Sequence, residues 1–143
     1  MKYNKSYDGG DFSDYLEYLK TIDLPKKLFD FASDPKRHDF SDESLHDSWL
    51  TSVNIGRDDF GNINISITLR AQKGKFRLLF RDVEYYRIAQ ATGDMYADLI
   101  TFEIGKEDGK YEKDLIYFNA EFALESGNIN VLSKYMEIKE ELD

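Results

Sequence analysis

Two histidine–aspartate pairs, His38-Asp39 and His46-Asp47, are the residues of this chain best suited to chemistry. A histidine next to a carboxylate can bind a metal ion or act as an oriented base. A metal site would need more ligands, and although Asp42 or Glu43 could supply one, nothing in the spacing enforces it. We therefore predict no catalytic residue, no metal site and no cofactor, and we expect the His46 ring to bond a backbone group.

The other paired carboxylates occur where acid–base catalysis is not expected. Asp58-Asp59, Glu107-Asp108 and Glu140-Glu141 fall in predicted turns or in the C-terminal tail. Nothing around them indicates the burial that shifts a carboxyl pKa to a catalytic value. The sequence also contains no glycine-rich phosphate loop after a strand and no Gly-x-Ser-x-Gly motif. These patterns favour a binding protein over an enzyme.

Basic residues are concentrated in one segment of a chain whose net charge is -9. Residues 70–87 contain six basic and two acidic residues, a net charge of +4, and Arg70, Arg77 and Arg81 are predicted to form a stripe on the solvent face of a sheet. Such a stripe can bind an anionic ligand, nucleic acid or an acidic partner, or it can pair with carboxylates on neighbouring strands. We favour the pairing, because exposed ion pairs are common and contribute little stability.

Acidic segments flank this basic one, with net charges of -5 for residues 1–60 and -8 for residues 88–143. The overall charge disfavours binding to nucleic acid or to anionic membranes, and it favours a basic protein as the partner. The candidate interaction surface combines basic, aromatic and acidic side chains, namely Arg70, Arg77, Arg81, Tyr85, Tyr86, Glu107, Asp108 and Glu112.

The elements that would position these residues are predicted to form a single domain over residues 1–143, with a helical part at 1–46 and a sheet at 47–143. Apolar residues recur at helical spacing from Phe12 to Ile22, and a second, shorter helix is predicted from Pro25 to a stop at Asp34-Pro35.

The clearest strand is Asn62–Arg70, in which apolar and polar residues alternate without interruption. Further strands are predicted near residues 49–56, 75–83, 98–105, 111–124 and 128–138. The alternation changes phase near Ser133-Lys134, which indicates a β-bulge there. These patterns predict an α+β fold in which two short N-terminal helices pack on a twisted, mainly antiparallel sheet of about six strands. A half-closed β-barrel is the alternative.

One pattern occurs twice, as Gly61-Asn62-Ile63-Asn64-Ile65 and as Gly127-Asn128-Ile129-Asn130-Val131. It can mark a duplicated three-stranded unit, or it can reflect the preference of any hairpin for Gly and Asn at its turn. We favour the second explanation, because the flanking residues of the two copies do not match.

The stretch Leu45-His46-Asp47-Ser48-Trp49-Leu50 resembles the Leu-His-Asp sequence that leads into the first strand of several families of small acidic bacterial proteins. Some of these families are uncharacterised, and some are immunity proteins of polymorphic toxin systems. The similarity extends in pattern over residues 45–138 and does not include the helical segment 1–34. It implies a helix-plus-antiparallel-sheet fold, a binding role without catalysis, and a structural role for Leu45, His46 and Asp47.

Two functional hypotheses follow from these patterns. The first is a non-enzymatic protein-binding module, of immunity type, that neutralises a basic partner. The second is a small-molecule-binding or hydrolytic domain with a pocket between the helices and the sheet. The sequence has no cysteine, no apolar leader and no apolar run near the ~20 residues of a membrane span, so we expect a cytoplasmic protein that does not act on membranes.

Overall fold

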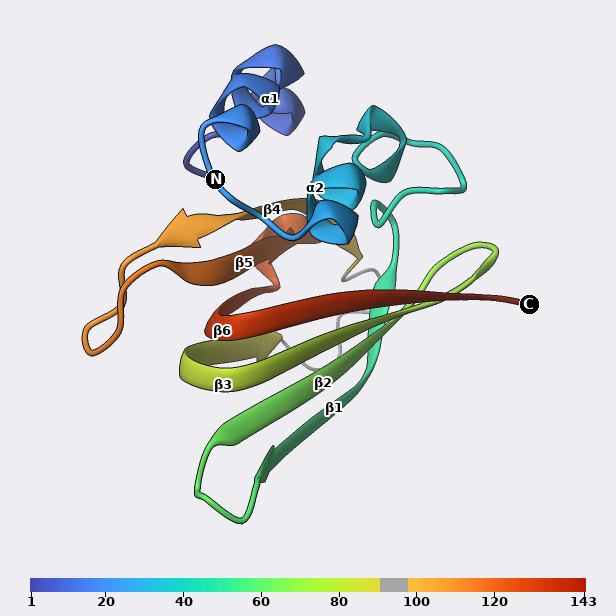
Figure 1. Cartoon of the computed structure of the whole chain (residues 1–143). Helices are drawn as coiled ribbons and strands as arrows, with labels where there is room; N and C mark the ends of the chain where they lie inside the picture. Colours follow the sequence, from blue (N-terminus) through green and yellow to red (C-terminus); the bar gives the residue numbers. More distant parts are fainter. Residues whose placement is uncertain (91–97) are drawn as a thin grey trace.

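The chain folds into two helices packed with a six-stranded antiparallel sheet that is not closed into a barrel (Figure 1). This is the α+β architecture that the sequence predicts. The computed structural model describes residues 1–90 and 98–143. Its elements are η1 Ser6–Asp8, α1 Phe12–Lys20, α2 Lys26–Ser33, η2 Pro35–Arg37, β1 Trp49–Arg57, β2 Ile63–Arg70, β3 Gly74–Gln90, β4 Leu99–Glu107, β5 Leu115–Phe122, η3 Ala123–Glu125 and β6 Gly127–Leu142.

The strand order is β1-β2-β3-β6-β5-β4, so two three-stranded meanders meet where β3 pairs with β6. The repeated Gly-Asn pattern does not follow this symmetry. Its first copy leads into β2, the second strand of one meander, whereas its second copy leads into β6, the third strand of the other. The pattern therefore marks the start of a strand after a turn at two positions that are not equivalent.

Strands β3 and β6 are long and bend together. The register of their pairing shifts between Val83 and Tyr85, so the extra residue lies on β3. Asp82, just before it, has a left-handed φ of 53°. The bulge predicted near Ser133-Lys134 is therefore wrong as placed, because the extra residue lies on the opposite strand of the pair. β3 also continues beyond the predicted end near Val83.

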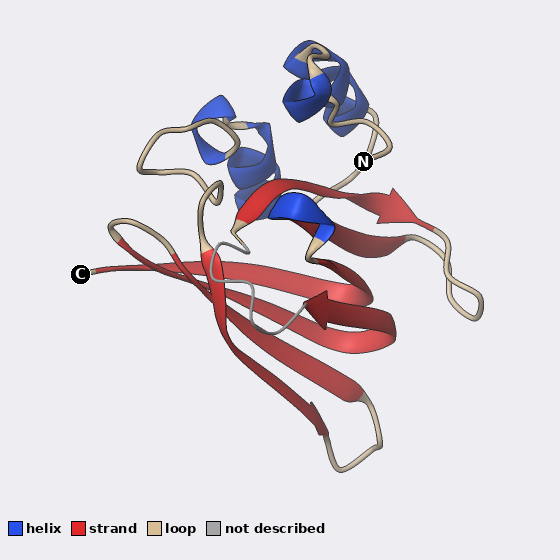
Figure 2. Ribbon diagram, turned by 180° about the vertical axis from the view of Figure 1, so that it is seen from behind, coloured by secondary structure: helices blue, strands red, loops and turns tan. Residues whose placement is uncertain are grey.

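The sheet divides at this bend, since β5 pairs with β6 only as far as Ser133. From Lys134 to Leu142, β6 pairs with β3 alone, and its other edge faces α2. Two views of the ribbon show the helices together on one side of the sheet (Figures 1 and 2). The sequence also predicts that Gly93-Asp94 interrupts regular structure, and these two residues lie outside the described part of the chain.

The core lies between the bent sheet and the helices. Six residues that the sequence pattern indicates as core are each no more than 2% exposed, namely Ile65, Ile67, Leu78, Phe80, Phe102 and Phe118. Phe31 of α2 packs its ring 5.8 Å from that of Phe76 and 5.9 Å from that of Phe102. One helix thus contacts both halves of the sheet, which fixes its position over the division between them.

Strand β1 departs from the alternation of Trp49, Thr51, Val53 and Ile55 that its sequence predicts. A register shift between Leu50 and Ser52 turns Leu50, Val53 and Ile55 toward the core, opposite buried residues of β2, and leaves Trp49 on the solvent face. The sequence pattern instead predicts that Trp49 points inward with Val53 and Ile55. The physical reason is again a bulge, which inserts one residue without interrupting the strand.

The outer edge of β4 is hydrogen-bonded to the N-terminal part of the chain. The Tyr15 hydroxyl donates to the Ile104 carbonyl at 2.7 Å and accepts from the Ile104 N–H at 2.8 Å. The Tyr18 hydroxyl bonds the same two groups of Lys106 at 3.2 and 3.1 Å. Edge N–H and C=O groups are a template for unwanted strand pairing, and α1 occupies them here.

A buried carboxylate ties the first residues to the sheet. Glu103 is fully buried and accepts hydrogen bonds from the N–H groups of Tyr3 and Asn4 and from the Tyr117 hydroxyl, at 2.7, 2.5 and 2.6 Å. The Tyr117 ring lies over Gly105, where a Cβ atom would approach it to 2.5 Å. Within the described residues, no helix combines the length and hydropathy that a membrane crossing requires.

Candidate functional site

A groove of about 990 Å³ runs between α2 and the free edge of β6. It is lined by residues of α2, β6, β3, β2 and the β1–β2 turn, namely Pro25, Lys26, Lys27, Leu28, Phe31, Asp58, Asn64, Leu79, Arg81, Asp82, Tyr135, Met136, Glu137 and Ile138. An adjoining hollow of about 350 Å³ shares Pro25, Tyr135 and Met136 with it, so the groove continues toward Ile116 of β5. We call this surface the α2–β6 groove.

The groove follows from the division of the sheet. Because β5 leaves β6 at Ser133, the strand after that point has one edge without a neighbouring strand. Met136 and Ile138 pair with Phe80 and Leu78 and so come from the core-facing side of β6, whereas Tyr135 and Glu137 come from its other side. The groove therefore wraps around the strand edge and presents apolar and polar side chains together.

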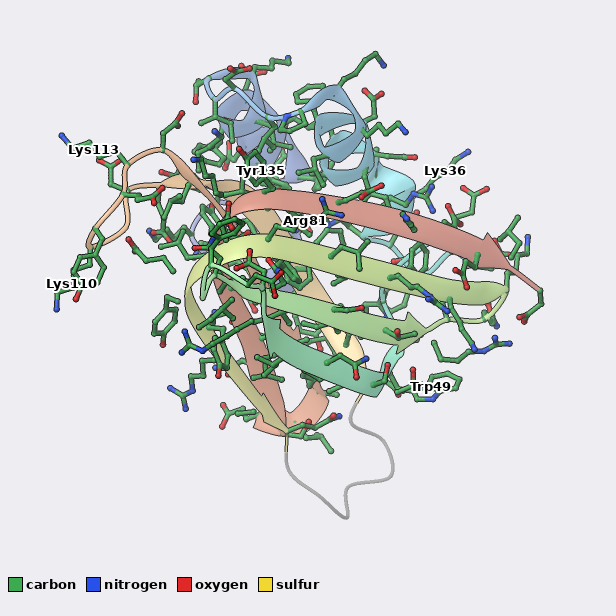
Figure 3. All side chains as sticks on the ribbon, turned by 60° about the horizontal axis from the view of Figure 1, so that its bottom comes forward. Lys36, Trp49, Arg81, Lys110, Lys113 and Tyr135 are labelled. Atoms are coloured by element: carbon green, nitrogen blue, oxygen red, sulfur yellow. The ribbon has the colours of Figure 1, made fainter. Side chains whose placement is uncertain are left out.

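Arg81 is one of three basic residues that line this groove, with Lys26 and Lys27. Its side chain is exposed and has no hydrogen bond or ion pair within residues 1–90 and 98–143. It lies directly opposite Tyr135, which is 54% exposed, on the neighbouring strand (Figure 3). Asp82 follows in a left-handed conformation, and its N–H donates to the Asn64 side-chain oxygen at 3.3 Å. Strained backbone of this kind often accompanies binding sites.

The other two arginines of the predicted basic stripe pair with carboxylates of the C-terminal residues. Arg70 donates from Nη1 to Asp143 Oδ1 at 2.8 Å, and Arg77 Nε lies 3.2 Å from Glu141 Oε1. The Arg77 contact, between the neighbouring strands β3 and β6, is the cross-strand pairing that we favour from the sequence, whereas Arg70 of β2 reaches past β3 to the residue that follows β6. Arg81 differs because its opposite neighbour is a tyrosine, and within the described residues its guanidinium group has no carboxylate partner.

The acidic candidates lie around the connection between β4 and β5, away from the groove. Glu107 pairs with Lys2 at 3.2 Å, and Asp108 accepts a hydrogen bond from the Asp114 N–H at 3.0 Å. Lys110 and Lys113 mark the tip of this connection in Figure 3. The backbone N–H of Glu112 donates to Glu84 of β3 at 2.9 Å. Of these three carboxylates, that of Asp108 bonds within the loop, and that of Glu107 ties the loop to the N-terminal segment.

Glu84 fixes this loop against β3. Burial opposes its ionisation, but N–H groups of Lys110, Tyr111 and Glu112 donate to its carboxylate, and they hold the pKa of Glu84 below its usual value. A Cβ atom at Gly109 would collide with the same carboxylate. Two further candidates, Tyr85 and Tyr86, follow Glu84 on the bent half of β3 and are largely exposed.

His46 does not make the backbone bond expected of it. Its Nδ1 lies 3.0 Å from Asp47 Oδ1, but the contact lacks hydrogen-bond geometry, and neither ring nitrogen has a hydrogen-bond partner among the described residues. The ring is 8% exposed and packs edge-on against Phe40 at 4.5 Å, beside a hollow of about 390 Å³. Instead, the backbone N–H of His46 donates to Ser44 Oγ at 2.8 Å.

His38, in contrast to His46, forms hydrogen bonds through both of its ring nitrogens. Its Nε2 donates to the Ala32 carbonyl at 2.7 Å, and its Nδ1 accepts from the Asn4 amide at 3.1 Å. The ring stacks on Phe102 with a centroid distance of 4.2 Å. Burial lowers the pKa of His38 to about 4, so the ring is neutral at physiological pH.

The Leu45-His46-Asp47 stretch leads into the edge strand β1 and is hydrogen-bonded to the other edge strand, β4. The Asp47 N–H donates to the Leu99 carbonyl at 2.8 Å, and the Leu99 N–H donates to the Ser48 carbonyl at 2.7 Å. Leu45 is fully buried, and Asp47 has a left-handed φ of 67°. Burial raises the pKa of Asp98 next to this joint, and the Asp47 carboxylate adds to the effect. No group of three or more His, Asp or Glu side chains suited to a metal ion occurs in the described part of the chain.

No protein-family model matches the chain, and no curated protein matches it. The functional argument therefore rests on the geometry of the α2–β6 groove and on the distribution of charge.

The sequence does not reveal the groove. Its residues come from five separate segments, and locally Leu28 and Phe31 have the spacing of an ordinary helix core face, as Met136 and Ile138 have that of a strand. The one local signal is Arg81, which continues the basic stripe but stands opposite Tyr135 in a register that the sequence alone does not fix.

Proposed function

We propose that this chain is a non-enzymatic protein-binding module that receives an extended segment of a basic protein in the α2–β6 groove. The groove itself is the observation that carries the proposal. It combines apolar side chains such as Leu79 and Ile138 with three carboxylates, those of Asp58, Asp82 and Glu137, which basic side chains of the partner could bind. Interfaces of this composition derive affinity from buried apolar anchors and specificity from the polar groups at their rim.

The dimensions of the groove suit a short stretch of polypeptide. It crosses from β6 over β3 to Asn64 on β2. Neighbouring strands are about 4.8 Å apart, so this crossing spans on the order of 10 Å before the adjoining hollow is added. An extended chain advances about 3.3 Å per residue, so roughly three to five residues would fill the groove.

Charge supports a basic partner. The chain carries a net charge of -9, and carboxylates such as Asp8, Asp14 and Asp23 belong to the helical N-terminal part. An acidic surface of this kind accelerates encounter with a basic protein and suppresses acidic competitors. Neutralisation of a basic toxin, as in immunity proteins, is the specific form of this proposal. The lack of cysteine fits a reducing compartment, so the proposal includes a cytoplasmic location.

A small ligand is the second candidate occupant. The volume of the α2–β6 groove lies at the upper end of the range of about 300–1,000 Å³ for small-molecule sites. Arg81, Asn64 and Tyr135 converge on it and could orient a polar ligand. The continuation of the groove into a second hollow favours the polypeptide, because a compact ligand needs one enclosed space.

Site-specific photocrosslinking tests the proposal directly. A photoreactive phenylalanine analogue replaces Tyr135 in the groove, and in a matched control it replaces Tyr85, which is equally exposed at 54% but lies outside the groove. In cells of the source organism, we expect the Tyr135 position to form one dominant adduct with a basic protein and the Tyr85 position to form none.

Crosslinking from Tyr85 at the same yield, or none from Tyr135 while the protein retains its fold by circular dichroism, would contradict the proposal. A mass increase at Tyr135 by a compound of low molecular weight would support the small-ligand alternative instead.

A further inference from the structure

The two edge strands of the sheet, β4 and β1, differ in whether other parts of the chain hydrogen-bond to their outer edges. The edge of β4 is occupied by hydroxyl groups of Tyr15 and Tyr18 and by the Asn4 amide, which donates to the Phe102 carbonyl at 2.9 Å. The outer edge of β1 has no such cover. Within the described residues it pairs only with β2, and Figure 2 shows it at the margin of the sheet.

Strand β1 also lacks the residues that usually prevent strand pairing. From Trp49 to Gly56 it contains no charged residue and no proline, and only Arg57 at its end is basic. Ile55, on the core-facing side, is 49% exposed, and Val53 on the same side is half-buried. An open edge with apolar residues at its margin is a template for a further strand.

The register within β1 identifies which strand fits. The bulge at Thr51 leaves a regular stretch from Ser52 to Arg57. If a second copy pairs antiparallel with this stretch around a two-fold axis at Asn54, Val53 of each copy lies opposite Ile55 of the other. Both residues face the core side, so four apolar side chains gather there, while Asn54 meets its own copy on the other face.

Charge is compatible with this arrangement at the contact itself. Two molecules of net charge -9 repel each other at long range, but the paired stretch brings no carboxylates together, because Ser52 through Gly56 are uncharged. We propose that two copies of this chain form a two-fold dimer by antiparallel pairing of their β1 strands around Asn54. The dimer extends the sheet across both copies and leaves both α2–β6 grooves open.

Such a contact is small and therefore reversible. Interfaces below about 1,200 Å² of total buried area are characteristic of weak association. The dimer should strengthen as salt is added, because screening removes the repulsion between like-charged copies. Binding of a basic partner in the groove should weaken with salt, so the two interactions respond in opposite directions and can fail independently.

Because the sequence contains no cysteine, single engineered cysteines can test where the two-fold axis of the dimer lies. Asn54→Cys places one thiol on each side of the axis, directly opposite its copy, within the Cα separation that a disulfide allows. Ser52→Cys is the matched control, since it is also exposed on the same face of β1. In the proposed register Ser52 lies opposite Gly56 of the other copy, so the Cα atoms of the two Ser52→Cys positions would be about 13 Å apart and their thiols unable to bond.

Under mild oxidation we expect Asn54→Cys to form a covalent dimer and Ser52→Cys to remain monomeric. Sedimentation equilibrium of the cysteine-free protein should show that dimerisation strengthens as salt is added. Ile55→Lys should weaken dimerisation about tenfold or more. Leu142→Lys, the same change at another exposed apolar residue, is the control. Equal crosslinking of the two cysteine variants would overturn the proposed register. A monomer at every concentration and salt would overturn the dimer.

Discussion

The two histidines of this chain occupy opposite environments. His38 has a partner for each ring nitrogen and stacks on Phe102, whereas His46 is buried with neither nitrogen hydrogen-bonded in the described structure. A buried polar atom without a partner costs free energy, and a satisfied one is costly to disturb. The two residues should therefore respond differently to protonation and to substitution.

Acid should destabilise the fold through His38. Its pKa is about 4 in the folded chain against 6.5 in the unfolded chain, so folding favours the neutral ring. The unfolded state then binds more protons between these values, and stability that is fully present above pH 6.5 is lost as the pH falls toward 4. Between about pH 7 and pH 5 we expect a loss of roughly 2 kcal/mol in the free energy of unfolding, measured by urea denaturation.

The matched control is His38→Gln, which cannot titrate in this range. Carboxylates contribute equally to both proteins, so the difference between them isolates the histidine. Parallel pH profiles for the two proteins would show that His38 is not the cause.

Replacing His46 by phenylalanine should not destabilise the protein. The change removes two buried nitrogens that have no partner in the described structure and keeps a ring against Phe40, so the free energy of unfolding should be unchanged or rise by about 1 kcal/mol. The same change at His38 should cost roughly 2–4 kcal/mol, because it strands the Ala32 carbonyl and the Asn4 amide.

Chemical denaturation measures the change in the free energy of unfolding for both substitutions. A cost above about 2 kcal/mol for His46→Phe would mean that the ring has a partner in solution. A rise in melting temperature with added Zn²⁺ that this substitution abolishes would identify that partner as a metal ion.

At the level of elements, the tyrosines of α1 seal the edge of β4. Tyr15→Phe removes one hydroxyl and leaves the N–H and C=O groups of Ile104 without a partner in a buried position. We expect a loss of roughly 2–4 kcal/mol in the free energy of unfolding, because each stranded group costs about 1–3 kcal/mol. Tyr111→Phe, at a residue that is 80% exposed, should change it by less than about 0.5 kcal/mol. Equal effects of the two substitutions on urea denaturation would contradict the sealing role.

Helices and most strands could be predicted from the sequence because each has a local period. The alternation over Asn62–Arg70 and the helical spacing after Asp11, which caps α1 by accepting from the Ser13 N–H, follow directly from residue types. The sequence does not predict the bulge at Thr51, and it predicts the one between Val83 and Tyr85 on the wrong strand, because the strand that carries the extra residue is decided by the pairing register and not by local composition. The spacing of Tyr15 and Tyr18 indicates core residues, and only the packed structure shows their hydroxyls on the β4 edge.

At the level of the whole molecule, the division of the sheet at Ser133 creates the α2–β6 groove. Its five contributing segments come together only in the tertiary structure, so sequence patterns could predict the charge of the surface but not the groove. The charge distribution is the part of the candidate site that the sequence does contain, because it is a property of composition alone.

Salt should slow the association with a basic partner. Screening limits the reach of surface charges to ~8 Å at physiological ionic strength, so the on-rate should fall as salt rises. Neutralising Glu107, Asp108 and Glu112 together, to Gln, Asn and Gln, should lower the on-rate further and leave the off-rate nearly unchanged. Asp108→Asn keeps the oxygen that accepts from the Asp114 N–H, so the loop should retain its shape. Rates from surface plasmon resonance that do not respond to salt or to this change would exclude electrostatic steering.

The most direct test of binding in the groove is the affinity of the crosslinked partner for two leucine variants, measured by isothermal titration calorimetry. Leu79→Asp places a charge on the groove floor, and Leu124→Asp places the same charge at an exposed leucine outside it. Binding in the groove predicts a Kd at least ~10-fold weaker for Leu79→Asp, because a buried anchor is lost, and within about 2-fold of the original for Leu124→Asp. Equal affinities for the two variants, each shown to be folded, would contradict binding in the α2–β6 groove.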